Sequence, residues 1–205
     1  MMKVLVVTGG IGSGKSLVCR MLAEKGIPVY EADRRAKQLY VEVPSMLDDM
    51  EAALGVRLRD SKGDFVASSL AEVIFRDQDA LNKVEDILFP VMKKDFADWA
   101  AAHGKEVVAC ESATVLEKPQ FDGFGDIVLL VDAPVQLRMS RAVSRDGVSE
   151  EKIQARMKAQ SLMNRLSEGE TDPRIDQVLV NDSTEAELRR KLDEFIEIYA
   201  LTKML

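Results

Sequence analysis

Side chains that commonly act as nucleophiles or metal ligands are scarce in this sequence of 205 residues, which has one histidine and two cysteines. His103 stands in a polar Ala-Ala-His-Gly turn, where we expect no catalytic role. The sequence shows no Ser-His or Cys-His pairing and no cluster of Cys and His, which argues against hydrolases of those types and against zinc proteins. Cys19 and Cys110 lie in apolar segments, which predicts buried thiols in a reducing compartment rather than a disulfide.

Excess positive charge and long apolar runs are also lacking. The net charge of -7 argues against nucleic acid or an anionic membrane as the main partner, because the field of the whole molecule repels polyanions. The first apolar run is too short for a signal peptide, and no later run approaches the length of a membrane span. With 46% hydrophobic residues, we expect a soluble cytoplasmic protein with a sizeable core. Monomer and homo-oligomer stay open.

Glycine is concentrated in one stretch, Gly9–Ser16, which matches G-x-x-x-x-G-K-[ST] at every fixed position. A β-branched apolar run precedes it over residues 3–8, and a segment with helical spacing follows over residues 17–23. This strand-loop-helix context predicts a phosphate-binding loop. Lys15 is expected to reach the β and γ phosphates of a nucleotide, and Ser16 to offer its hydroxyl to Mg²⁺. The predicted nucleotide-binding residues of this loop are Gly10, Ile11, Gly12, Ser13, Gly14, Lys15 and Ser16.

The rest of the chain alternates short apolar runs with helical patterns, which indicates an α/β fold of the P-loop NTPase type. Five parallel strands are expected, and their carboxyl ends should face one crevice. Predicted strands cover residues 3–8, 27–30, 105–110, 127–132 and 178–180. Helices are expected over residues 34–40, 45–54 and 149–166, in a basic segment after Pro134 and in an amphipathic segment after Thr184. Residues 66–103 lack a good strand, so we interpret them as a helical insertion in which Pro90 starts or kinks a helix.

Acidic side chains follow two of the predicted strands. Asp33 comes just after the second strand, where a carboxylate can take the proton of an acceptor hydroxyl. An equally good interpretation is that Asp33 caps the helix beginning at Arg34. Glu111 ends the third strand and either meets an acceptor or a metal-bound water, or closes the strand as a solvated charge.

Basic and amide side chains follow the fourth and fifth strands. Arg138, Arg141 and Arg145 are spaced three and four apart, so they share one face of a helix. They suit a lid that binds a triphosphate, or a solvated face paired with acids such as Asp146. Asn181 follows the fifth strand, where it either contacts adenine or helps to cap the last helix.

These segments together resemble the dephospho-CoA kinase family, whose members transfer the γ-phosphate of ATP to the ribose 3′-hydroxyl of dephospho-CoA. The matching segments are residues 8–16, 26–33, 131–134, 145–149, 156–160 and 175–181, together with Arg141. The resemblance implies a core over residues 1–45, 104–136 and 170–205, a helical acceptor-binding region over about 46–103 and a lid over about 137–169. It also implies that Asp33 is the base, that Arg141 and Arg145 are lid cations, and that Asn181 lies at the adenine site.

The sequence departs from the family pattern mainly where the acceptor is expected to bind. Glu31 stands where the family has Asp, Phe89 where it commonly has His, Arg138 where a Gln is common, and Ala113–Glu117 in place of Pro-Leu-Leu-x-Glu. We assign Glu31, Asp33 and Glu111 to the acceptor region. The alternatives are another small P-loop kinase and a non-kinase ATPase or nucleotide switch, although the Asn-Lys-x-Asp signature of guanine-binding switches is missing.

Overall fold

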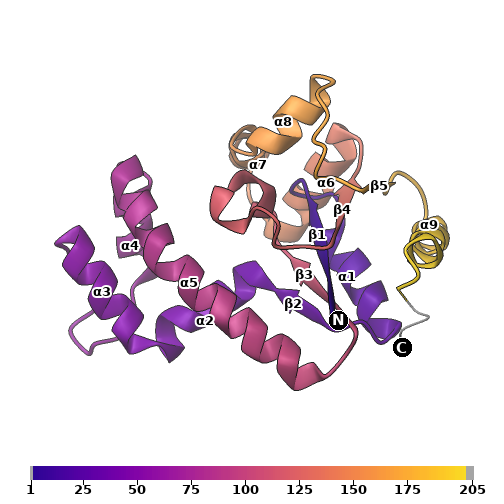
Figure 1. Cartoon of the computed structure of the whole chain (residues 1–205). Helices are drawn as coiled ribbons and strands as arrows, with labels where there is room; N and C mark the ends of the chain where they lie inside the picture. Colours follow the sequence, from indigo (N-terminus) through magenta and orange to yellow (C-terminus); the bar gives the residue numbers. More distant parts are fainter. Residues whose placement is uncertain (1, 202–205) are drawn as a thin grey trace. The chain divides into compact units, whose positions relative to one another are not determined.

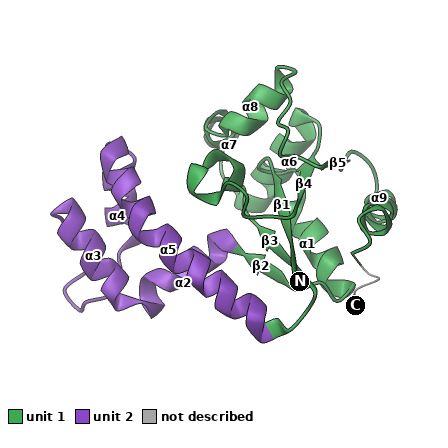
Figure 2. Cartoon of the chain, viewed as in Figure 1, with its two compact units in different colours: residues 1–31, 103–205 green, residues 32–102 purple. Residues whose placement is uncertain are grey.

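The computed structural model describes residues 2–201 and divides into two compact units (Figure 2). The first unit comprises residues 1–31 and 103–205, and the second comprises residues 32–102. Each unit has a hydrophobic core of its own. The second unit is therefore an insertion within the sequence of the first.

Within the described part of the chain, the first unit is built on a parallel five-stranded sheet with the order β2-β3-β1-β4-β5 (Figure 1). The strands are β1 (Lys3–Gly9), β2 (Val29–Glu31), β3 (Val107–Glu111), β4 (Ile127–Asp132) and β5 (Gln177–Val180). The predicted sheet is confirmed. Because β1 runs parallel to both of its neighbours, the loop after it lies at the same edge of the sheet as their carboxyl ends.

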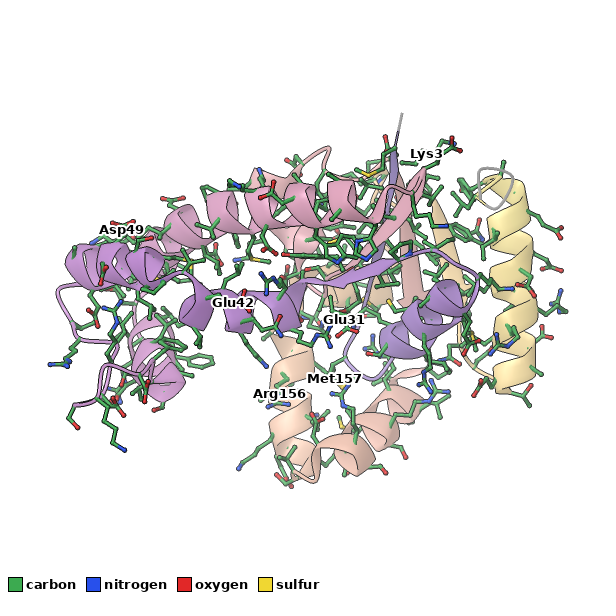
Figure 3. All side chains as sticks on the ribbon, turned by 90° about the horizontal axis from the view of Figure 1, so that it is seen from below. Lys3, Glu31, Glu42, Asp49, Arg156 and Met157 are labelled. Carbon is green, nitrogen blue, oxygen red and sulfur yellow. The ribbon has the colours of Figure 1, made fainter. Side chains whose placement is uncertain are left out.

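Alternate residues of β1 enter two different hydrophobic clusters, as the period of two in a strand requires. Leu5 and Val7 pack in one cluster with α1 (Lys15–Glu24) and α9 (Glu185–Ile198), whereas Val6 packs in another with Val128. The side of α9 that faces away from the sheet carries charged side chains (Figure 3). Cys19 and Cys110 are both buried, and neither forms a disulfide within the described residues, as predicted.

The helical connection after β4 differs from the prediction. It contains α6 (Val135–Asp146), α7 (Glu150–Lys158) and α8 (Ser161–Ser167), whereas one helix was expected over residues 149–166. The break is at Gln160, whose φ of -87° and ψ of 90° are not helical. Ile153 and Met157 of α7 keep helical spacing, but Leu162 follows Ile153 by nine residues and would lie on the opposite face of a continuous helix, so the apolar pattern already carried a sign of this break.

The second unit is helical, as predicted, apart from an isolated antiparallel bridge between Arg59 and Phe65. Its helices are α2 (Ala32–Glu42), α3 (Pro44–Leu54), α4 (Ala67–Ile74) and α5 (Gln78–His103). The unit begins at Ala32, and Leu39 of α2 is buried in the same cluster as Met46 and Met50. α5 continues through Pro90, so this proline does not start the helix. Over residues 2–201, no helix combines the length and hydropathy that a membrane span needs.

Candidate active site

The loop between β1 and α1 depends on two glycines with positive φ. Gly12 has a φ of 74° and Gly14 a φ of 103°, a region that side-chain-bearing residues rarely adopt. A Cβ on Gly12 would lie 2.1 Å from the carbonyl oxygen of Arg138, and one on Gly14 would lie 2.2 Å from Asn181 Nδ2. The close approach of α6 and of the residue after β5 therefore leaves no room for a side chain at either glycine.

The loop leads directly into α1, whose first two residues are Lys15 and Ser16. The Lys15 ammonium donates to the carbonyl oxygens of Gly9, at 2.9 Å, and Gly10, at 3.2 Å. The Ser16 side chain is exposed. The first N–H groups and the dipole of α1 add partial positive charge at the same place, so the arrangement suits a bound polyphosphate.

Asn181 connects the end of β5 to this loop. Its side chain is buried, and Nδ2 donates to the Ser13 carbonyl oxygen at 2.8 Å. The Arg141 guanidinium donates to the backbone carbonyl oxygen of Asn181 at 3.1 Å and to its Oδ1 at 3.4 Å. The alternative that Asn181 caps the last helix is wrong, because Thr184 is the N-cap of α9 and accepts from the Glu187 N–H.

The arginines of α6 have different surroundings although they share a helical face. Arg138 is only 6% exposed, and its guanidinium packs against Gly10. Its Nη1 lies 3.4 Å from Asp132 Oδ1. The alternative that these arginines form a solvated face is therefore wrong for Arg138. Burial lowers the pKa of Arg138, and the Asp132 carboxylate opposes that shift. Arg145 is paired with Asp146 at 2.6 Å, which is the ion pair expected for a solvated face.

Asp146 also accepts from Arg156 of α7 at 2.9 Å, so one carboxylate holds two arginines. The hydrogen bond from Arg145, and then the charges of both arginines, lower the pKa of Asp146. The structure thus joins Asn181 to the P-loop and Arg141 to Asn181, while Arg145 pairs with the carboxylate that links α6 to α7.

The predicted acidic residues lie at or just beyond the carboxyl ends of β2 and β3. Glu31 and Glu111 are register partners at the carboxyl ends of these parallel strands. Both carboxylates add to the effect of burial, which is the main cause of the raised pKa of the Cys19 thiol. Asp33 lies in the first turn of α2, two residues beyond Glu31. It is not the N-cap residue proposed as its alternative role, because α2 begins at Ala32 rather than Arg34.

Two contacts near the loop were not foreseen. Gln160 Oε1 accepts from the Ile11 N–H at 2.8 Å, and Glu117 Oε1 accepts from the Leu162 N–H at 2.8 Å. Both glutamine and glutamate are ordinary surface residues by composition, so only the resemblance over residues 156–160 and the final Glu of Ala113–Glu117 marked these positions.

A sequence model of the dephospho-CoA kinases matches residues 3–187 of this chain. The chain belongs to the dephospho-CoA kinase family. The dephospho-CoA kinase of Porphyromonas gingivalis is 39% identical to it over 166 residues, which cover 81% of each chain. That of Chlorobaculum tepidum is 36% identical over 195 residues, which cover 92% of this chain and 90% of the relative. Membership of the dephospho-CoA kinase family makes the chain an ATP-dependent kinase.

Solved structures agree with the dephospho-CoA kinase fold. A protein from Thermus thermophilus superposes with a TM-score of 0.82 at 25% identity and 97% coverage of both chains. The dephospho-CoA kinase of Campylobacter jejuni superposes with a TM-score of 0.66 at 20% identity, with both chains covered completely (100%). At that identity the second likeness shows the fold alone.

Proposed function

We propose that the chain transfers the γ-phosphate of ATP to the ribose 3′-hydroxyl of dephospho-CoA, in the cytoplasm, as the last step of coenzyme A synthesis. The observation that carries this proposal is the family match over residues 3–187. A P-loop alone suits many nucleotide-binding proteins, so the acceptor is inferred from the family rather than from the fold. The contact of Asn181 with the loop, and that of Arg141 with Asn181, support the same nucleotide site.

In this proposal the triphosphate lies in the loop Gly9–Ser16, at the positive end of α1. The Lys15 ammonium exchanges the carbonyl oxygens of Gly9 and Gly10 for β- and γ-phosphate oxygens. Arg141 supplies a further cation, and Asn181 lies on the adenine side. Arg145 becomes a second lid cation when phosphate oxygens replace the Asp146 carboxylate as the partner of its guanidinium.

The exposed Ser16 hydroxyl fits Mg²⁺, a hard cation that takes oxygen ligands and is bound largely through substrate phosphates. When bound, Mg²⁺ neutralises charge on the phosphoryl group in transfer. The chain contributes the hydroxyl, and the loop Gly9–Ser16 keeps the phosphates next to it.

Asp33 is the proposed base, and Glu31 and Glu111 belong to the acceptor side. Asp33 takes the proton of the 3′-hydroxyl while that oxygen forms a bond to the γ-phosphorus. The bond from the γ-phosphorus to the bridging oxygen breaks, and ADP leaves with the electron pair. The product is coenzyme A.

The test measures ADP release from ATP and Mg²⁺ with and without dephospho-CoA, for the wild type and for Asp33→Asn. We expect turnover that requires dephospho-CoA and falls by about 10²-fold or more in Asp33→Asn, the usual range for loss of a general base. Asp49→Asn, the same change at an exposed site on α3, is the matched control and should keep wild-type turnover.

Other outcomes would reject parts of the proposal. Turnover with nucleoside monophosphates or other hydroxylated metabolites, but not with dephospho-CoA, would make the chain another small P-loop kinase. Slow ATP hydrolysis that no acceptor accelerates would favour the non-kinase ATPase. Full activity of Asp33→Asn would remove Asp33 from the role of base.

A further inference from the structure

Gln160 is the residue at which the helical segment after β4 breaks, and it contacts the P-loop from there. It is the N-cap residue of α8, with backbone angles outside the helical region. From this position its Oε1 accepts from the Ile11 N–H at 2.8 Å, across 149 residues of sequence. Ile11 belongs to the middle of the loop, between Gly10 and Gly12. A continuous helix over this segment would give Gln160 a different backbone direction, so the break and the contact belong together.

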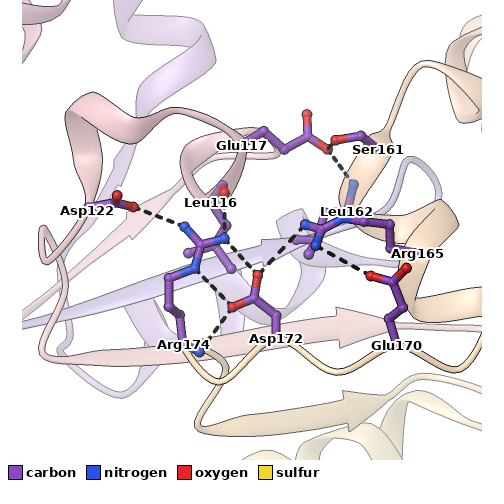
Figure 4. A network of polar contacts seen from close by, with 9 residues as sticks. All are labelled: Leu116, Glu117, Asp122, Ser161, Leu162, Arg165, Glu170, Asp172 and Arg174. Carbon is purple, nitrogen blue, oxygen red and sulfur yellow. Dashed lines mark hydrogen bonds and ion pairs between the residues drawn. The ribbon is translucent and has the colours of Figure 1, made fainter.

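The first turn of α8 is held in place by the segment after β3. Glu117 of the short helix η1 (Val115–Glu117) accepts from the Leu162 N–H at 2.8 Å and from Ser161 Oγ at 3.2 Å (Figure 4). A carboxylate that accepts the N–H groups of a first turn satisfies donors that have no helical partner. Leu162 and Met163 are buried, which adds apolar contact at the same turn. The residues next to Gln160 are therefore anchored by hydrogen bonds and by packing.

The other end of α8 is anchored by a network of charges (Figure 4). The Asp172 carboxylate accepts from Arg174 Nε at 2.9 Å and Nη2 at 2.7 Å, and Arg165 of α8 lies 4.0 Å from the same carboxylate. Arg174 also donates to Asp122 at 3.0 Å and to the Leu116 carbonyl oxygen at 2.8 Å. This network connects α8 to the segment that contains η1, so Gln160 projects from a support that is fixed at both ends.

We propose that Gln160 is a positioning residue for ATP: it holds the middle of the P-loop in the conformation that accepts phosphate. The inference rests on the proposed ATP site. Ile11 lies between Gly10 and Gly12. These two glycines make this part of the loop costly to order, because glycine loses more backbone freedom on ordering than other residues. A hydrogen bond made before the nucleotide arrives removes part of that ordering cost from binding. Removing the bond should therefore weaken ATP binding rather than slow the chemical step.

The main test compares Gln160→Met with Gln154→Met. Methionine keeps the length of glutamine but offers no oxygen to the Ile11 N–H, and Gln154 is an exposed glutamine on α7 that serves as the matched control. Titration calorimetry gives the ATP dissociation constant, and steady-state kinetics give KM and kcat. For Gln160→Met we expect ATP affinity about three- to tenfold weaker, the range for one hydrogen bond. The KM for ATP should rise equally, with kcat and the KM for dephospho-CoA unchanged.

Hydrogen exchange of the nucleotide-free protein gives a readout that does not depend on turnover. Peptides that cover Gly9–Ser16 should exchange faster in Gln160→Met and at the wild-type rate in Gln154→Met. Gln160→Glu keeps an acceptor for the Ile11 N–H, so its loop should stay protected. ATP affinity should still fall in Gln160→Glu, because the added charge repels the triphosphate.

Different results would overturn the ATP site and the role of Gln160. A wild-type protein that does not bind ATP would overturn the proposed function itself. Wild-type binding together with unchanged affinity in Gln160→Met would overturn the role of Gln160. Tighter binding in Gln160→Met would also overturn it, because Gln160 would then compete with phosphate for the Ile11 N–H. If Gln160→Met lost thermal stability but kept normal ATP affinity and normal exchange of the loop, Gln160 would contribute to stability and not to ATP binding.

Discussion

Replacing Asn181 by leucine tests how the end of β5 supports the P-loop. Leucine has a similar shape but cannot donate to the Ser13 carbonyl oxygen, which Asn181 Nδ2 reaches at 2.8 Å in a buried setting. A buried acceptor that loses its donor costs about 1–3 kcal/mol. The bond from Arg141 Nη2 to Asn181 Oδ1 is long, at 3.4 Å, so its loss adds little. We therefore expect Asn181→Leu to lower the free energy of unfolding by about 2 kcal/mol.

For a chain of this size, about 2 kcal/mol corresponds to a fall in Tm of roughly 4–8 °C. Differential scanning calorimetry measures it, with and without ATP and Mg²⁺. The increase in Tm that ATP causes should be smaller in Asn181→Leu, because the variant also distorts the loop that binds phosphate. Gln177→Leu, an amide-to-leucine change at an exposed site on β5, is the control and should shift Tm little. If Asn181→Leu melts within about 1 °C of that control, the buried hydrogen bond does not support the loop as reasoned.

Two further predictions concern groups in the same unit. In Asp172→Asn the charge that holds Arg174 is lost, so we expect urea denaturation at pH 7 to show a loss of about 1–2 kcal/mol. The hydrogen bond from Arg174 lowers the pKa of Asp172 in the folded state, so its stabilisation is full above the unfolded pKa, near 4, and is lost as pH falls through the folded pKa. The wild-type advantage over Asp172→Asn should therefore shrink on acidification below about pH 4, and a constant difference down to pH 2 would contradict the assignment. Thr8→Val removes a buried hydroxyl that has no hydrogen-bond partner among the described residues, so Tm should rise by about 2–4 °C; a fall would show that the hydroxyl has a partner.

The elements whose formation depends on local sequence could be predicted well. The apolar runs of β1 and β4 have the length and composition of buried strands, and the motif Gly9–Ser16 has the glycines that its backbone conformation requires. Alternating strands and helices implied a parallel sheet, and the resemblance to the dephospho-CoA kinase family predicted the kinase activity. Boundaries were less secure: α2 belongs to the second unit because Leu39 packs with residues that follow it, a contact that periodicity does not specify.

The sequence by itself thus determined the phosphate-binding loop, the strands around it and the family. Only the tertiary structure decided which polar side chains support the loop. Arg138 and Arg145 share a helical face, yet one is buried beside Gly10 and the other pairs with Asp146 in the solvent-exposed part of α6. Gln160 contacts Ile11 across 149 residues of sequence. The physical reason is that a polar side chain has many acceptable local partners, and the packing of distant segments selects one of them.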